Sequence, residues 1–270
     1  MENKPLVTII TPTYNRKNLI GRTILSIVKQ TYDNIEHIIV NDGGEDVSDV
    51  IEVVAGTYPE KAKRIKYINK PKNEGVSAAR NSALERAHGD YICLLDDDDI
   101  YYPLAVEFRL WAMEKFNADV VYTKALRDIW EVRGDGYVSI GKDLYWECSF
   151  DKDLILIQNV ANSECVTFSR RAWDKTGNYL FDPKIKYCED YDFWVALSRE
   201  NDFYELSLID AESSIRPADQ NQITGHRDFS EGHIAIYKKW RHTARDLEFV
   251  TKAQNEVLLS LGKNPEDYGL

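Results

Sequence analysis

The segment YICLLDDDDIYY, residues 91–102, joins an apolar run directly to four consecutive aspartates. The apolar part has the length and composition of a buried strand. Four adjacent carboxylates repel one another, so each must be solvated, paired or neutralised where the strand ends. The segment therefore predicts a buried strand that presents acids to a cationic partner.

The residues before this segment alternate between apolar runs and helical patterns. The apolar runs are residues 6–11, 37–40 and 65–68. Helical spacing or composition is found at residues 18–30, 47–54 and 76–88. This order predicts an α/β fold with a mostly parallel sheet and helices on both faces. Ligands bind such sheets beyond the carboxyl ends of the strands, so we expect one edge to be formed by the loops at residues 12–15, 41–44, 69–74 and 96–99.

Composition narrows the class of protein. The chain has 270 residues, of which 43% are hydrophobic and 29% charged, as in a soluble globular protein. Its net charge of -11 argues against general nucleic-acid binding, which needs clustered cations. Four scattered cysteines fit a reducing compartment, and we find neither a signal-peptide pattern nor an apolar run of bilayer length. We therefore expect a cytoplasmic protein with no transmembrane segment.

The second half of the chain is less regular. Glycines among aromatic residues predict a hairpin or loop at 124–150, and a helix is expected at 190–199. Two short apolar runs, 165–168 and 204–210, are typical of strands. A long helical pattern covers residues 229–261.

Acids dominate the predicted edge of the sheet. The patterns G-x-x-x-x-G-K-[ST] and H-E-x-x-H are absent, and no G-x-G-x-x-G follows the first strand. Mg²⁺ and Mn²⁺ prefer oxygen ligands, typically one or two carboxylates with substrate phosphates completing the shell. The acid run therefore favours a divalent cation that attracts a diphosphate.

Four longer motifs occur in order: VTIITPTYNR (7–16), ILSIVKQTYDNIEHIIVNDG (24–43), NEGVSAARNSALERAHGDYICLLDDDD (73–99) and CEDYDFWVALS (188–198). Over roughly residues 5–200 they resemble the family 2 glycosyltransferases, inverting enzymes of the GT-A fold. The resemblance implies a nucleotide-sugar donor, a UDP-sugar by expectation, with Mn²⁺ or Mg²⁺ as cofactor. It also implies inversion at the anomeric carbon and a context of polysaccharide or glycoconjugate synthesis.

The resemblance divides the chain into three parts. Residues 1–123 would be the donor-binding lobe, residues 124–228 an acceptor-binding lobe sharing the sheet, and residues 229–270 a C-terminal helical segment. The acceptor would be a saccharide or a lipid-linked saccharide. Basic residues and Trp240 in the last segment are compatible with peripheral contact at the inner face of a membrane, and a packed amphipathic helix is the alternative.

The acid run occupies the D-x-D position of the family. The resemblance implies that Asp98 ligates the metal and that Asp96 or Asp97 binds the ribose or a metal-bound water. The alternative is a solvated acidic turn in which Asp98 or Asp99 caps a helix that starts near Tyr101.

Many relatives carry an Arg-x-His pattern after the last core strand. Here Arg216 is present, but Ala218 stands where the His would fall. The resemblance makes Arg216 a candidate ligand of the diphosphate. His226 or His233, from the following segment, is the candidate that would replace the missing metal ligand.

Three residues beyond the first two strands match positions that bind the nucleoside. Thr13 and Tyr14 would cradle it, with Tyr14 stacking on the base, and Asp42 would accept a hydrogen bond from the base. Many relatives have two acids at the last position, and Asn41 replaces the first. The alternatives are turns, closed by Thr13 and Tyr14 or by an Asp42 side chain bonded to its own NDGG backbone.

The remaining candidates are one arginine of the third motif and two acids of the fourth. Arg80 matches a family position that reaches the donor, and its alternative is a surface pair with Glu74 or Glu85. Asp190 matches the catalytic base, which transfer to a hydroxyl requires, and Glu189 would orient the acceptor. The alternative for both acids is the preference of carboxylates for a helix N-terminus.

Two other functions compete with this interpretation. A nucleotidyltransferase would also use acids, a metal and a nucleotide, but the EDYDFW segment fits it poorly. A catalytically silent nucleotide-sugar-binding or scaffold protein would bind without turnover, and the presence of Asp98 and Asp190 argues against it.

Overall fold

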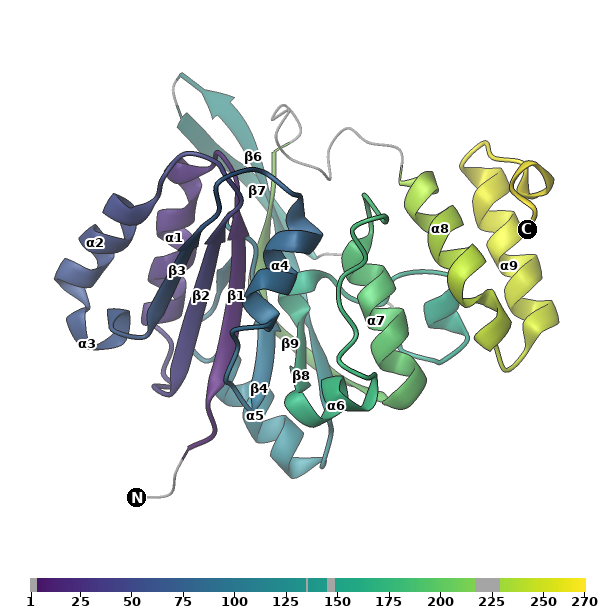
Figure 1. Ribbon diagram of the computed structural model, residues 1–270, viewed down its shortest axis with the longest axis horizontal. Helices are drawn as coiled ribbons and strands as arrows, with labels where there is room; N and C mark the ends of the chain where they lie inside the picture. The colour runs from purple at the N-terminus through teal and green to yellow at the C-terminus, as the bar shows by residue number, and fades with distance from the viewer. Residues whose placement is uncertain (1–3, 135, 145–148, 217–228) are drawn as a thin grey trace.

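The computed structural model describes residues 4–134, 136–144, 149–216 and 229–270. Its described strands form a nine-stranded sheet in the order β3-β2-β1-β4-β8-β6-β9-β5, with β7 paired to β6 (Figure 1). The strands are β1 Val7–Thr13, β2 Ile35–Asn41, β3 Ile65–Asn69, β4 Tyr91–Leu94, β5 Ile100–Tyr101, β6 Val120–Arg133, β7 Gly136–Leu144, β8 Val166–Ser169 and β9 Phe203–Ile215. The α-helices are α1 Lys17–Val28, α2 Ser48–Thr57, α3 Pro59–Ala62, α4 Val76–Leu84, α5 Ala105–Lys115, α6 Arg170–Lys175, α7 Glu189–Glu200, α8 Ser230–Trp240 and α9 Leu247–Ser260. Short 3-10 helices lie at η1 Leu154–Leu156, η2 Ser163–Cys165, η4 Arg241–Thr243 and η5 Pro265–Tyr268.

Strand directions gather the ends of six strands at one edge of the sheet. In the first half, β1 runs parallel to β2 and β4, and β2 runs parallel to β3. In the second half, β8 is antiparallel to both β4 and β6, and β9 is parallel to β6. The carboxyl ends of β1, β2, β3, β4 and β9 and the start of β8 therefore share one edge. This is the edge at which the sequence predicts the site.

Helices cover both faces of the sheet, as predicted. Successive side chains of a strand point to opposite faces. Ile38 and Val40 of β2 belong to the same buried cluster as Ala79 of α4, whereas Ile39 packs in a second cluster with Ile24 of α1. The side chains of β2 are thus buried by helices on both sides, which explains the apolar run HIIV in the sequence.

The alternative in which a helix starts near Tyr101 is wrong. Residues 100–101 form the short strand β5, whose Ile100 pairs with Glu212 of β9. Helix α5 begins only at Ala105, after Leu104 in the N-cap position, and has no side-chain cap. Asp99 therefore caps no helix. Its Oδ1 instead accepts a hydrogen bond from the backbone N–H of Ser214 at 2.8 Å, which ties the acid run to β9.

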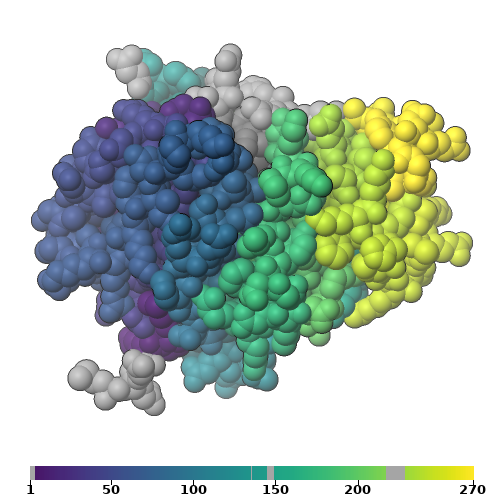
Figure 2. Space-filling view, viewed as in Figure 1, coloured from purple at the N-terminus to yellow at the C-terminus, as the bar shows by residue number. Residues whose placement is uncertain are grey.

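The last third of the chain lies against the sheet through α7. The space-filling view shows the green surface of this region between the purple and blue N-terminal part and the yellow C-terminal helices (Figure 2). The helical pattern at 229–261 divides into α8 and α9, and Tyr237, Val250 and Leu258 on these helices are fully buried. The helices of the described residues are too short or too polar to span a bilayer.

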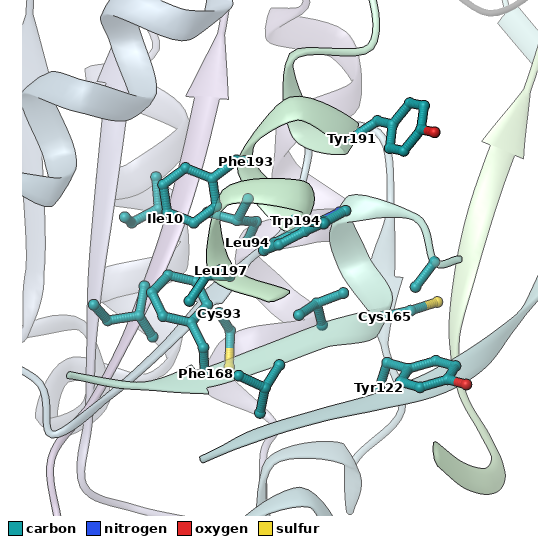
Figure 3. Close-up of a cluster of buried hydrophobic side chains, with 14 of the residues drawn as sticks. Ile10, Cys93, Leu94, Tyr122, Cys165, Phe168, Tyr191, Phe193, Trp194 and Leu197 are labelled. Atoms are coloured by element: carbon teal, nitrogen blue, oxygen red, sulfur yellow. The ribbon is translucent and has the colours of Figure 1, made fainter. Parts of the chain in front are cut away.

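Aromatic side chains fix α7 on the sheet. Phe193 and Trp194 are fully buried and point from the helix toward Phe168 of β8, Ile10 of β1 and Leu94 of β4 (Figure 3). The ring of Phe168 lies 5.6 Å from that of Phe193 and 6.2 Å from that of Trp194. Such tilted and edge-to-face pairs add to the large apolar area that these rings bury. The start of α7 is therefore a rigid platform.

A buried charge fixes the other side of α7. The side chain of Asp192 is fully buried and accepts hydrogen bonds from the Tyr179 hydroxyl at 2.6 Å and from the Trp240 indole N–H at 2.7 Å. The ammonium group of Lys239, on α8, lies 3.1 Å from the same carboxylate. These contacts satisfy the carboxylate and join α7 to α8.

We expect Asp192→Ala to lower the free energy of unfolding by about 3 kcal/mol, because it leaves the Trp240 and Tyr179 donors without their buried acceptor. Denaturant unfolding followed by tryptophan fluorescence measures the change. The matched control is Glu60→Ala, which removes one member of an exposed ion pair with Lys63 and should change little. Equal stabilities of the two variants would show that Asp192 does not hold α7.

Candidate functional site

Arginines neutralise the centre of the acid run. Asp97 and Asp98 are only 2% and 5% exposed, so the alternative of a solvated acidic turn is wrong. Arg16 lies 2.9 Å from Asp97 and 3.3 Å from Asp98. Arg216, which follows β9, reaches the same Oδ2 of Asp98 at 2.5 Å. Burial raises the pKa of Asp97 to about 6, although the charge of Arg16 opposes this shift.

Arg80 joins the acid run to α7. Its guanidinium donates to Asp96 at 2.7 Å and to Glu189 at 2.6 Å, and the residue is only 1% exposed. The alternative of a surface pair with Glu74 or Glu85 is therefore wrong. Burial alone would lower the pKa of Arg80, but the carboxylates around it hold that pKa above its usual range. Asp96, by contrast, keeps 34% of its side chain exposed.

The two acids of the CED segment lie at the first turn of α7. Cys188, in the left-handed conformation with φ of 63°, turns the chain into the helix. Burial raises the pKa of Glu189 to about 7 despite the attraction of Arg80. Burial also raises the pKa of Asp190. The Ser163 hydroxyl lies 3.2 Å from Asp190 Oδ2.

Close packing supports the loop in front of these acids. A Cβ atom on Gly232 of α8 would lie 2.4 Å from the carbonyl oxygen of Tyr187. Only glycine allows this approach of the α8 backbone to the residue that precedes Cys188. The C-terminal helices thus contact the segment that carries the predicted base.

Asp42 contacts a neighbouring loop, not its own turn. Its Oδ2 accepts the backbone N–H groups of Glu74 at 3.0 Å and Gly75 at 2.7 Å, and its Oδ1 lies 2.5 Å from the Lys70 ammonium group. The turn alternative for Asp42 is therefore wrong. Asn41 has that role instead, because its amide N–H group donates to the carbonyl oxygens of residues 44 and 45. Gly43, which follows Asp42, has a φ of +73°, and a Cβ atom at this position would clash with the backbone of residues 72 and 73.

A cleft of about 670 Å³ joins these groups. Thr13 is buried in it, whereas Tyr14 is 45% exposed at its wall. Of the predicted residues, those that line the cleft are Thr13, Tyr14, Asp42, Arg80, Asp96, Asp97 and Glu189. The opposite wall includes Pro183, Ile185, Lys186 and Tyr187. Asp98 and Asp190 are not lining residues, but each directly follows one.

Two histidines, His226 and His233, are the candidates for completing the metal shell. Ala218 and His226 lie outside the described residues. His233 lies on α8, where its ring packs 5.8 Å from that of Tyr191 and 5.9 Å from that of Tyr237. Within the described ranges, no group of three or more His, Cys, Asp or Glu side chains has the arrangement of a metal site.

Sequence reasoning missed three side chains at this edge. Arg16 directly follows the PTYN turn, and Lys70 lies in the loop 69–74 after β3, so both positions carried the signal of a strand end. Ser163 carried no such signal, because it precedes a strand. Since β8 is antiparallel to β4, its beginning lies at the site edge.

The comparisons with known proteins decide the family. The family model described as "Glycosyl transferase family 2" matches residues 8–177, more than half of the chain. The chain belongs to glycosyl transferase family 2. The resemblance inferred from the four motifs is confirmed, and the chain is a glycosyltransferase.

Two curated relatives cover most of the chain. A glycosyltransferase of Rickettsia prowazekii is 31% identical over 85% of this chain and 72% of the relative. WcaA of Escherichia coli K12, a glycosyl transferase assigned to colanic acid biosynthesis, is 30% identical over 88% of this chain and 82% of the relative. The chain spans only 31% of a Rickettsia bellii glycosyltransferase and 20% of the chondroitin synthase of Pasteurella multocida.

Solved structures confirm the GT-A fold. Staphylococcus aureus TarS, in its complex with UDP-GlcNAc, is 17% identical, with a TM-score of 0.68 over 94% of this chain and 71% of the TarS chain. The mannosyltransferase PcManGT of Pyrobaculum calidifontis, in complex with GDP-Man and Mn²⁺, is 14% identical. Its TM-score is 0.60 over 97% of this chain and 76% of that chain.

We expect the buried Glu189 carboxyl to make stability depend on pH. Its pKa of about 7 lies above the ordinary 4.5, so the native state binds this proton more tightly than the unfolded chain. Stability from this group is therefore present at acidic pH and is lost as pH rises toward 7 and above. Glu189→Gln retains an oxygen acceptor for Arg80 and removes the titration. In metal-free buffer it should raise the melting temperature at pH 8 by about 3 °C and change little near pH 4.5.

The control for this measurement is Glu200→Gln, the same substitution at an exposed position at the end of α7. We expect it to follow the wild type at both pH values. A Glu189→Gln protein that is less stable than the wild type at pH 8 would show that the ion pair with Arg80 outweighs the cost of burying the charge.

Proposed function

We propose that this glycosyltransferase moves a sugar from a UDP-sugar to a hydroxyl group of a saccharide or lipid-linked saccharide, with a divalent metal and with inversion. One observation carries the proposal: buried Arg80 bridges Asp96, in the cleft, and Glu189, at the first turn of α7. A donor bound in this cleft would present its anomeric carbon beside the two acids of α7. The context would be polysaccharide or glycoconjugate synthesis, as for WcaA.

The nucleoside end of the cleft supports a nucleotide donor. Exposed Tyr14 and buried Thr13 both line the cleft, and the ring of Tyr14 would stack on the base. Asp42 is held by two backbone N–H groups and Lys70, so its carboxylate is fixed before any ligand arrives. TarS binds UDP and UDP-GlcNAc, which supports a uridine nucleotide as the donor of this chain, and Asp42 is the acceptor that we assign to its base.

Oxygen donors at the acid run fit Mg²⁺ or Mn²⁺. Asp98 would ligate the ion and Asp96 would contribute directly or through water, with phosphate oxygens completing the shell. When bound, the ion would stabilise the negative charge that develops on the departing diphosphate. Arg216 lies against Asp98 and is the cation that we assign to the same diphosphate.

Asp190 is the base in this proposal. It would take the proton of the acceptor hydroxyl while that oxygen attacks the anomeric carbon from the face opposite the diphosphate. One attack from the opposite face inverts the configuration. Glu189 would hold the acceptor, and its contact with Arg80 keeps it in place. The three-part division of the chain follows from these roles: donor binding in residues 1–123, acceptor binding in 124–228 and a C-terminal helical segment in 229–270.

We expect Asp98→Ala to abolish the metal-dependent part of UDP binding, because the cation links this carboxylate to the diphosphate. Isothermal calorimetry with UDP, in Mn²⁺ and then in EDTA, measures it on the wild type and the variant. Asp33→Ala, at an exposed position, is the control. Unchanged affinity of Asp98→Ala for UDP in Mn²⁺ would remove Asp98 as the ligand. If the wild type binds none of UDP, GDP, CDP and dTDP, the assignment of a nucleotide-sugar donor is wrong.

We expect Asp190→Asn to leave UDP binding intact and to lower sugar transfer by at least about 10², because the amide cannot accept the proton. Transfer is measured as UDP released in the presence of acceptor, with a UDP-sugar chosen by a binding screen. A variant that retains transfer would exclude Asp190 as the base. Binding without turnover in the wild type would favour the scaffold alternative.

A further inference from the structure

We propose that Ser163 is a positioning residue. Its hydroxyl group accepts a hydrogen bond from Arg80 and donates one to Asp190, and it thereby fixes the orientation of the Asp190 carboxylate. The inference rests on the proposed role of Asp190 as the base. Ser163 lies outside all four family motifs.

The hydrogen-bond chemistry of the three groups fixes the direction of the contact. Ser163 Oγ lies 3.4 Å from Arg80 Nη2 and 3.2 Å from Asp190 Oδ2. A guanidinium has only donors, so the hydroxyl accepts from Arg80. Its single proton is then directed at Asp190, which accepts. Ser163 is 6% exposed, so water competes little for either contact.

The second oxygen of Asp190 is also held. Oδ1 accepts the backbone N–H of Tyr191, in the first turn of α7, at 2.8 Å. One oxygen of the carboxylate is thus fixed by its own helix and the other by Ser163. Loss of the hydroxyl would leave the orientation of the carboxylate to a single local contact.

The segment that carries Ser163 is rigid enough for this role. The carbonyl oxygen of Glu164 accepts from Arg109 Nη2 at 2.9 Å, and that of Cys165 accepts from the Thr123 hydroxyl at 3.2 Å. Arg109 is fully buried and binds Asp210 through two N–H groups at 2.7 and 2.6 Å. The short helix η2 is therefore fixed to β6 and β9, and a group on such a support can hold another in place.

Several charged groups around Asp190 influence its pKa, and the hydrogen bond from Ser163 acts in addition to them. Arg80 favours the ionised carboxylate, whereas Asp96, Glu164, Glu189 and an ionised Cys188 would each disfavour it. Burial is the largest effect and raises the pKa of Asp190. A hydrogen bond donated to the carboxylate favours its charged form. The Ser163 contact therefore keeps more of the base ready to accept a proton.

Carboxyl ¹³C NMR of Asp-labelled, metal-free protein tests the contact without any ligand. The Asp190 resonance is assigned from its loss in Asp190→Asn. We expect Ser163→Ala to move its titration upward by about one pH unit, the size of one charge-assisted hydrogen bond. Ser163→Thr, which keeps the hydroxyl, should titrate like the wild type. Ser163→Cys, which keeps the shape and weakens the donor, should shift in the direction of Ser163→Ala and serves if the latter fails to fold.

The matched control is Ser82→Ala on α4, whose hydroxyl donates to the carbonyl oxygen of Ala78 in its own helix. Transfer from the UDP-sugar chosen by the binding screen is then measured against pH. Ser163→Ala should lower kcat about tenfold on the acid limb with the donor KM unchanged, and Ser163→Thr should restore it. A wild-type titration and pH profile in both Ser163→Ala and Ser163→Cys would overturn the inference and leave the proposed function intact. Undiminished transfer by Asp190→Asn would instead overturn the proposed function, and the inference with it.

Discussion

The site depends on one buried cation. Arg80 lies between Asp96, after β4, and Glu189, at the start of α7. Removing a guanidinium from water is costly, and two carboxylates at hydrogen-bond distance are what make this burial tolerable. In turn, Arg80 joins the loop after β4 to α7, the helix that carries the predicted base. Its guanidinium carbon also lies over the ring of Phe181, 5.4 Å from the ring centre.

The acid run is largely neutralised inside the protein. Arg80 meets Asp96, Arg16 meets Asp97, and Arg216 shares Asp98 with Arg16. A divalent cation at Asp98 would therefore join or displace a guanidinium, not fill an isolated negative site. A displaced guanidinium would then pair with the diphosphate of the proposed donor. Such an exchange would conserve charge pairing and leave no buried charge without a partner.

The first half of the fold was readable because its signals are local. Apolar runs such as HIIV, separated by helical periods, specify parallel strands, and the motifs located Thr13, Asp42, Arg80 and Asp190 at their edge. Asp99 was misplaced because helix capping and pairing with Ser214 look alike in a sequence. Ser163 could not be found at all, since its position depends on the antiparallel direction of β8. That direction is set by long-range pairing with β4, and the sequence around β8 has no alternation of strand and helix that would predict it.

The raised pKa values of two buried acids indicate how much stability the surrounding fold must provide. Asp97 and Glu189 have pKa values of about 6 and 7, because burial opposes their charge more strongly than the arginines favour it. Near neutral pH these groups destabilise the free protein, and strain of this kind at a functional site must be offset elsewhere. The packing of Trp194 against Phe168 and the contacts of Asp192 with α8 hold α7, the helix that begins with Glu189. Because α7 is held by these contacts, it can keep the Glu189 carboxylate buried, although this group would be more stable in solvent when it is ionised.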